Sequence, residues 1–166
     1  MHRVICLAAL ICLSATVARA QGASTKMSGT GRSSKPDQQY QIPVPDRPGH
    51  TFSISQNKFT WTSPWEILGI RAVGGVDTSS TETADTTAHF RGLYVETMEN
   101  GDKAFYQYQG TTLVGPDAPQ TFQANWALIG GTGKLEKVRG KGSCKIERQS
   151  DGTSWYECEG EYWTLK

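Results

Sequence analysis

Residues 122–146 read FQANWALIGGTGKLEKVRGKGSCKI, and this stretch decides the fold class of the chain. Apolar residues occupy every second position at its start: Phe122, Ala124, Trp126 and Leu128. Such alternation is typical of a β-strand with one buried face. The glycines that follow can adopt the positive φ angles of a strand connection, and a second strand-like segment comes after them. The stretch therefore predicts two adjacent strands joined by a glycine-rich turn.

Similar patterns recur along the rest of the chain. They predict strands at residues 50–54, 58–62, 65–73, 88–98, 103–112 and 122–128, and a final hairpin around Asp151. Residues 77–87 are rich in Thr and Ser and are predicted to form a surface loop. About eight strands with short connections can avoid exposed edges by closing into a barrel. We therefore expect an all-β fold with a single antiparallel eight-stranded β-barrel, and a two-sheet β-sandwich is the alternative.

The segment 88–112 predicts a hairpin, because Asn100-Gly101 favours a tight type I′ turn. In that register Val95 lies opposite Tyr106. Alternation then places six side chains on one face: His89, Arg91, Leu93, Val95, Tyr106 and Tyr108.

A second hairpin is predicted around residues 150–152, which Cys144 and Cys158 flank symmetrically. In this register the two cysteines lie opposite each other, and Lys145 faces Glu157 on the other side of the sheet. Directly opposed strand residues have Cα atoms about 4.5–5.5 Å apart, a separation that a disulfide can span. We therefore predict a Cys144–Cys158 disulfide.

Residues 1–20 have the composition of a secretory signal peptide. His2 and Arg3 precede an apolar run at residues 4–13, and residues 18–20 read Ala-Arg-Ala, a small-residue cleavage signal. A bilayer-spanning helix needs roughly 20 apolar residues, so this run is too short to be one. We expect a secreted or periplasmic protein without a transmembrane segment, in a compartment that permits disulfides.

After the leader, residues 21–38 are polar and rich in Gly, Ser and Lys, which predicts a flexible segment. Residues 39–166 then form one β-barrel domain. Without Arg3 and Arg19 the chain keeps 15 basic residues against 16 acidic ones, a formal charge of −1. Such a balance gives no electrostatic reason to bind nucleic acid.

Cofactor and metal motifs are incomplete. The sequence GGTGK at residues 130–134 suggests a phosphate loop, but Leu128 and Leu135 stand where the motif needs a glycine and a hydroxyl. Only His50 and His89 remain after the leader, without HxH or HExxH spacing. We predict neither a cofactor nor a metal.

The segment from Trp126 through Gly142, with GGTGK, a spacer and VRGKG, resembles the corresponding part of the allene oxide cyclase-like and dirigent-like barrels. This resemblance implies an eight-stranded antiparallel barrel around an apolar cavity. Members of that family guide the cyclisation or radical coupling of small hydrophobic molecules. The resemblance assigns no catalytic residue here, because the family's catalytic residues do not align with this chain.

Together these observations favour a barrel that binds a small, largely apolar molecule in its interior. The ligand-binding residues that we expect are His89, Arg91, Leu93, Tyr106, Tyr108 and Trp126. The aromatic rings would supply contact area, and His89 or Arg91 would orient an anionic or carbonyl-bearing ligand. In the alternative interpretation, His89 and Arg91 lie near an exposed strand end and only cover the rim.

Two other functions stay open at this point. An isomerase- or cyclase-type enzyme would use Glu66, His89 or a tyrosine to move a proton. A non-catalytic envelope interaction protein would have a barrel filled by side chains. We expect a homo-oligomer if an apolar outer face carrying Trp163 and Leu165 is uncovered.

Overall fold

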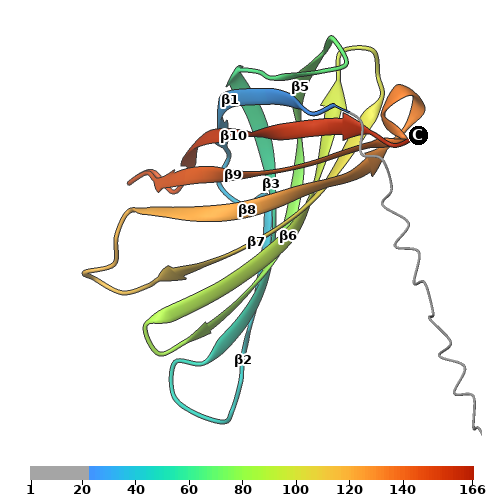
Figure 1. Cartoon of the computed structure of the whole chain (residues 1–166). Helices are drawn as coiled ribbons and strands as arrows, with labels where there is room; N and C mark the ends of the chain where they lie inside the picture. Colours follow the sequence, from blue (N-terminus) through green and yellow to red (C-terminus); the bar gives the residue numbers. More distant parts are fainter. Residues whose placement is uncertain (1–22) are drawn as a thin grey trace, which may run out of the picture.

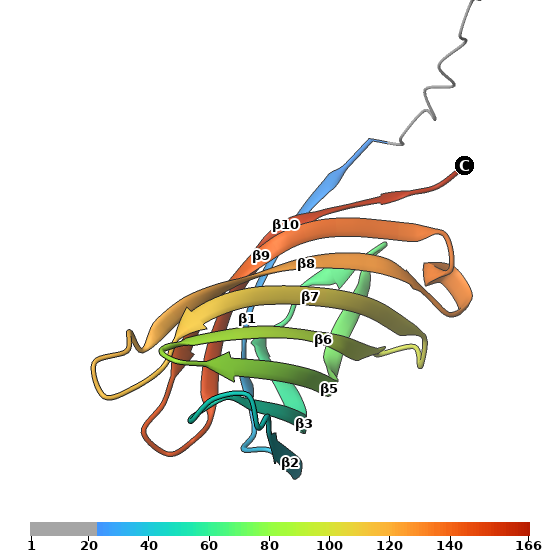
Figure 2. The same ribbon diagram turned by 90° about the horizontal axis from the view of Figure 1, so that it is seen from below.

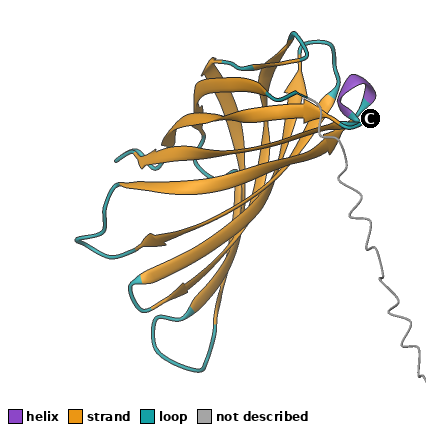
Figure 3. Ribbon diagram, viewed as in Figure 1, coloured by secondary structure: helices purple, strands orange, loops and turns teal. Residues whose placement is uncertain are grey.

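The computed structural model describes residues 23–166, so the predicted signal peptide lies outside the described residues. The described chain is all-β and forms a closed antiparallel eight-stranded barrel with two extra strands outside it (Figures 1 and 3). The barrel strands are β1 (Thr25–Ser33), β3 (Thr51–Ser63), β5 (Ile70–Ala84), β6 (Thr87–Met98), β7 (Lys103–Leu113), β8 (Thr121–Gly131), β9 (Val138–Arg148) and β10 (Ser154–Thr164).

Strand β3 closes the barrel, because it pairs with β5 along one edge and with β1 along the other. Each remaining barrel strand pairs with its neighbour in the order β1, β10, β9, β8, β7, β6 and β5. The extra strands are β2 (Gln38–Pro43), which pairs with β3, and β4 (Glu66–Ile67), which pairs with β5. Figure 2 shows β2 lying beyond the ring. The predicted barrel is confirmed, and the β-sandwich alternative is wrong because the ring is closed.

Strand β1 overturns part of the predicted leader at residues 21–38. Residues 25–33 are a barrel strand in which Met27, Gly29, Gly31 and Ser33 alternate with outward positions. A Cβ atom at Gly29 would overlap the Trp61 ring, and one at Gly31 would overlap the Phe59 ring. The low hydrophobicity of this stretch therefore reflects close packing under aromatic rings and not the flexibility that its composition predicts.

Strand β5 overturns the predicted loop at residues 77–87. Its Ser79 and Thr81 side chains face the barrel interior, and strand pairing continues on both sides up to residue 83. A polar interior thus made a long strand look like a loop. The strands predicted at 50–54 and 58–62 are likewise parts of one strand, β3.

The β6–β7 hairpin exists, but its predicted register was wrong by one residue. The structure pairs Tyr94 with Tyr106 and Val95 with Phe105. Among the turn residues only Gly101 has a positive φ, 87°, whereas a type I′ turn needs two such residues. The connection is instead a three-residue loop in which the Gly101 N–H donates to the Met98 carbonyl at 2.9 Å. The one-residue shift turns every β6 side chain to the opposite face.

The β9–β10 hairpin has the predicted register. Cys144 and Cys158 lie opposite each other with Cα atoms 4.1 Å apart, and they form the predicted disulfide. Lys145 faces Glu157 on the outer side.

One end of the barrel is filled by an apolar cluster. Its fully buried members include Ile67, Met98, Leu128, Leu135 and Val138. Leu135 belongs to the short 3-10 helix η1 (Gly133–Leu135), which connects β8 to β9. Within residues 23–166 no helix is long and apolar enough to cross a membrane. The cluster closes this end and leaves the remaining interior to a cavity.

Candidate functional site: an aromatic cavity in the barrel

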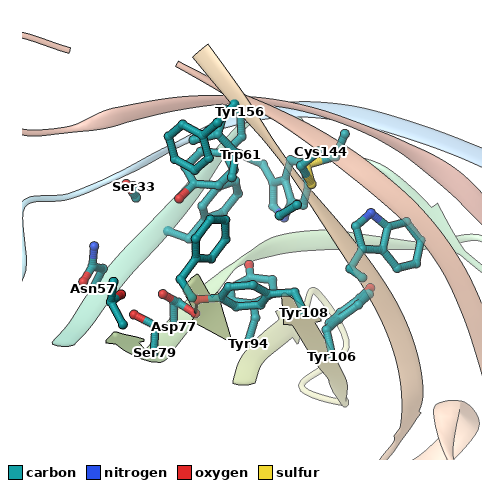
Figure 4. A pocket seen from close by; sticks show the side chains of 18 of the residues that line it. Ser33, Asn57, Trp61, Asp77, Ser79, Tyr94, Tyr106, Tyr108, Cys144 and Tyr156 are labelled. Atoms are coloured by element: carbon teal, nitrogen blue, oxygen red, sulfur yellow. Dashed lines mark hydrogen bonds between the residues drawn. A yellow bond between two sulfur atoms is a disulfide. The ribbon is translucent and has the colours of Figure 1, made fainter. Parts of the chain in front are cut away.

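A cavity of about 230 Å³ lies in the barrel interior next to the apolar cluster (Figure 4). Aromatic side chains form most of its wall: Phe59, Trp61, Trp65, Phe90, Tyr94, Tyr106, Tyr108, Phe122, Trp126 and Tyr156. Polar side chains from β1, β3 and β5 complete it: Ser33, Asn57, Asp77, Ser79 and Thr81. The Cys144–Cys158 disulfide also contributes to the lining. The cavity therefore has a broad aromatic surface and one polar side.

Glycines on neighbouring strands let the rings lie against the barrel wall. A Cβ atom at Gly92 would overlap the Tyr108 ring, and one at Gly142 or Gly160 would overlap the Trp126 ring. Because each ring fills the space that a side chain would otherwise occupy, the centre of the barrel stays open. The glycine pattern that favoured a barrel in the sequence thus also accounts for the cavity.

At the base of the cavity, Glu96 is a completely buried carboxylate. It accepts hydrogen bonds from Trp61 Nε1 (2.6 Å), Trp65 Nε1 (3.0 Å) and the Tyr106 hydroxyl (2.7 Å). Burial raises the pKa of Glu96, and the three donors partly oppose that rise. Both carboxylate oxygens accept hydrogen bonds, so Glu96 holds three aromatic side chains in place. They come from β3, β7 and the segment before β4.

Nearer the middle of the cavity, Asp77 is a second carboxylate with fewer partners. Its Oδ1 atom accepts a hydrogen bond from the Tyr108 hydroxyl at 2.6 Å. Within the described chain its Oδ2 atom makes no hydrogen bond. Burial raises the pKa of Asp77 to about 6, against the lowering effect of the Tyr108 bond. Asp77 therefore changes its charge near neutral pH inside the cavity.

Three further polar atoms of the lining are buried without a hydrogen-bond partner in the described chain: Asn57 Oδ1, the Tyr94 hydroxyl and Trp126 Nε1. Asn57 lies directly opposite Asp77 in the pairing of β3 with β5. In Figure 4 Asn57, Asp77 and Ser79 gather on one side of the cavity. Leaving a buried polar atom unpaired costs about 1–3 kcal/mol, so each of these atoms destabilises the interior unless a partner bonds to it.

The structure divides the six predicted ligand-binding residues into two groups. Tyr106, Tyr108 and Trp126 line the cavity. His89, Arg91 and Leu93 lie on the exposed outer face of β6, because of the register shift in the β6–β7 hairpin. The prediction that His89, Arg91 and Leu93 face the interior was wrong.

Other candidates from the sequence also lie away from the cavity. The side chain of Glu66 is exposed, and His89 Nδ1 bonds to the Thr111 hydroxyl on the outer face. Within residues 23–166 no group of three or more His, Cys, Asp or Glu side chains is arranged to hold a metal ion.

Sequence reasoning missed Glu96 and Asp77, the two carboxylates of the interior. One signal could have found Glu96: it continues the alternation of Phe90, Gly92 and Tyr94, the face with aromatic residues and a glycine. That face suits an interior in which rings lie over glycines. Asp77 carried no comparable signal, because its neighbours are as polar as those of a loop.

The fold and cavity define this protein as an eight-stranded antiparallel barrel with an aromatic, partly acidic interior. A solved pterocarpan synthase dirigent protein is similar in structure, with a TM-score of 0.52 and 13% identity over 92% of this chain and 95% of that chain. At that identity the similarity shows a shared fold alone, in agreement with the resemblance of residues 126–142.

A second solved structure, a protein of unknown function from the DUF3224 family of Shewanella oneidensis MR-1, has a TM-score of 0.45. It is 15% identical over 83% of this chain and 96% of that chain. No protein-family model and no curated protein matches the sequence.

Proposed function

We propose that this protein binds a small, largely apolar molecule in the barrel interior. The observation that carries the proposal is an aromatic cavity with three buried polar atoms that lack partners. Aromatic walls with a few converging polar groups are typical of small-molecule sites. The interior is therefore unlike that of an eight-stranded barrel filled entirely by side chains, which an interaction protein would have.

The size of the cavity limits the ligand. A cavity of about 150 Å³ holds a benzene ring, so 230 Å³ accommodates one substituted ring or an aliphatic body of similar size. Rings from several directions would contact such a molecule on both of its faces. Its polar substituents would bond to Asn57, Tyr94 or Trp126, whose free atoms supply both an acceptor and donors.

The disulfide supports the proposal that the protein works outside the cytoplasm, either secreted or in the periplasm, because such bonds persist in oxidising compartments. The similarity of fold supports distant membership of the allene oxide cyclase-like and dirigent-like barrels. Self-association through Trp163 and Leu165 stays a prediction.

A second candidate function, an isomerase- or cyclase-type enzyme, is favoured by one observation. Asp77 lines the cavity, and its pKa of about 6 suits a group that exchanges a proton near neutral pH. In that case Asp77 would transfer a proton to or from the bound molecule, while the aromatic walls restrain its conformation. Turnover of a bound compound by the wild type and not by Asp77→Asn would support this candidate.

Binding can be tested with a matched pair of variants on β8. Ala124 lines the cavity, whereas Ala127 on the same strand points outward. In the wild type, we expect benzyl alcohol to shift the NMR signals of the cavity tryptophan indoles. Ala124→Leu should weaken binding at least about tenfold by filling the cavity, and Ala127→Leu should leave it unchanged. Saturating benzyl alcohol without any indole shift in the wild type would reject the proposed function.

A further inference from the structure

The charged groups of the cavity all have the same sign. Asp77 is the only charged side chain among the lining residues, and Glu96 lies beneath Trp61, Trp65 and Tyr106. No Lys, Arg or His belongs to the described lining. This distribution is opposite to the one expected from the sequence, in which His89 and Arg91 faced the interior.

Asp77 is arranged to accept one more hydrogen bond. Tyr108 occupies Oδ1, and Oδ2 has no hydrogen-bond partner in the described chain. Asn57 lies across from Asp77 and belongs to the lining, and its buried Oδ1 atom is a second acceptor without a hydrogen-bond partner in the described chain. Two acceptors on adjacent strands suit a ligand group that carries several donors, and an ammonium group has up to three.

The aromatic walls add a second preference for positive charge. The face of an aromatic ring carries negative electrostatic potential and attracts a cation within about 6 Å of its centre. Tyr94, Tyr108 and Tyr156 line the cavity around Asp77, and Phe59 and Trp61 belong to the neighbouring β3 wall. A cation next to Asp77 would thus have aromatic side chains on several sides.

The tyrosines that face Asp77 do not compensate for its charge. The pKa values of Tyr94 and Tyr108 lie well above their usual range because of burial, and burial raises the pKa of Tyr156 to about 12. These three side chains stay neutral near pH 7, while Asp77 is ionised above about pH 6. An ionised carboxylate in a cavity of low polarity is costly unless it is paired.

Arg148 is a cationic side chain in contact with a lining residue, at the opposite end of the barrel from the apolar cluster. Its guanidinium lies 4.5 Å from the centre of the Phe122 ring, and its Nη2 atom donates to the Thr112 hydroxyl at 3.4 Å. Arg148 is not part of the lining, although Phe122 is. Within residues 23–166, Asp77 has no ionic partner.

From this arrangement we infer that the cavity selects a cationic ligand, a protonated amine on a small aromatic or aliphatic body, with Asp77 as its counter-ion. The inference rests on the proposed function and adds the charge of the ligand. Asp77 and Asn57 bind the ammonium group, and the rings of the opposite walls hold the apolar body.

Three probes of similar size and different charge test the inference: benzylamine, benzyl alcohol and benzoate. At a pH of about 7.5, where Asp77 is ionised, benzylamine should bind at least about tenfold more tightly than benzyl alcohol. Benzoate should bind most weakly. Asp77→Asn should remove the preference, so that this variant binds benzylamine no more tightly than benzyl alcohol, while its amide oxygen can still accept the Tyr108 hydroxyl. Asp117→Asn, which removes a carboxylate from an exposed loop, should keep the preference.

Each other outcome has a definite meaning. Equal binding of benzylamine and benzyl alcohol would overturn the inference and leave the proposed function intact, whereas binding of no probe would reject the proposed function. Tightest binding of benzoate would also overturn it and point to Arg148. If Asp77→Asn does not fold, the wild type still decides. Benzylamine affinity should fall as the pH decreases through about 6, with benzyl alcohol affinity unchanged, and a flat benzylamine profile would overturn the role of Asp77.

Discussion

The two carboxylates inside this barrel lie on neighbouring strands, Glu96 on β6 and Asp77 on β5, and differ in the number of hydrogen bonds that they accept. Glu96 accepts three hydrogen bonds, and both of its oxygens are bonded. Asp77 accepts one hydrogen bond, and Asn57 opposite it has an unpartnered oxygen. A carboxylate whose oxygens all accept hydrogen bonds within the protein stabilises the fold, whereas one with a free oxygen can still accept a hydrogen bond from a ligand. This difference separates the structural base of the cavity from its proposed binding wall.

The largest effect on stability is expected for Glu96→Gln. In the wild type each carboxylate oxygen accepts at least one indole N–H. The glutamine NH₂ group replaces one of these oxygens and cannot accept, so at least one buried donor loses its acceptor. We expect the free energy of unfolding to fall by about 3 kcal/mol, measured by urea denaturation with tryptophan fluorescence. Glu159→Gln, on the exposed side of β10, is the matched control and should change little. A loss below about 1 kcal/mol would contradict the structural role of Glu96.

Asp77→Asn should raise the free energy of unfolding, whereas Glu96→Gln lowers it. The pKa of Asp77 is about 6 in the folded protein and 3.8 in its ordinary state, so ionisation favours the unfolded chain. The contribution of neutral Asp77 is fully present below about pH 4 and disappears as the pH rises through about 6. At a pH of about 8 the variant should be more stable than the wild type by about 2–3 kcal/mol.

At a pH of about 3, below the ordinary pKa of 3.8, Asp77 is mostly neutral in both states, and the difference between variant and wild type should nearly vanish. Urea denaturation at the two pH values measures this. An equal stability difference at both pH values would show that the charge of Asp77 has no part in it.

The smallest expected effect is the difference in unfolding free energy between Tyr106→Phe and Tyr108→Phe. Each variant removes one hydroxyl that donates to a carboxylate, at 2.7 Å for Glu96 and 2.6 Å for Asp77. Water in the cavity can replace the bond to Asp77, but nothing can reach Glu96. We expect thermal and urea unfolding to show a loss larger by about 1 kcal/mol for Tyr106→Phe. Equal losses would mean that the two carboxylates are equally shielded.

The sequence predicted those parts of the molecule in which alternation within one strand was enough. Tyr106, Tyr108 and Trp126 were assigned to the interior because each strand alone puts them on one face. The β9–β10 hairpin was also predicted correctly, since paired cysteines and opposite charges agree on one register.

The failures have a physical cause in the same molecule. Asn100-Gly101 is compatible with two turn types that differ by one residue, and local sequence does not choose between them. That choice decided whether Glu96 or Arg91 faces inward. Strands β1 and β5 look like flexible or loop segments because most of their inward residues are glycine, serine and threonine. In β1, the Trp61 and Phe59 rings of the neighbouring strand β3 leave no room for a side chain at Gly29 and Gly31, and the sequence of β1 alone does not show this.

Pairing of β1 with both β10 and β3 has a consequence for the order of assembly. Hairpins such as β6–β7 and β9–β10 join neighbours and can form early, whereas β1 cannot pair with β10 until residues 154–164 have been synthesised. Ring closure connects the most distant strands and bears the largest loop-closure entropy. Since β10 contributes Tyr156 and Cys158 to the lining, the cavity is complete only after this last step. A chain whose barrel is still open has no complete cavity, so a ligand of the proposed kind could bind only after the ring has closed.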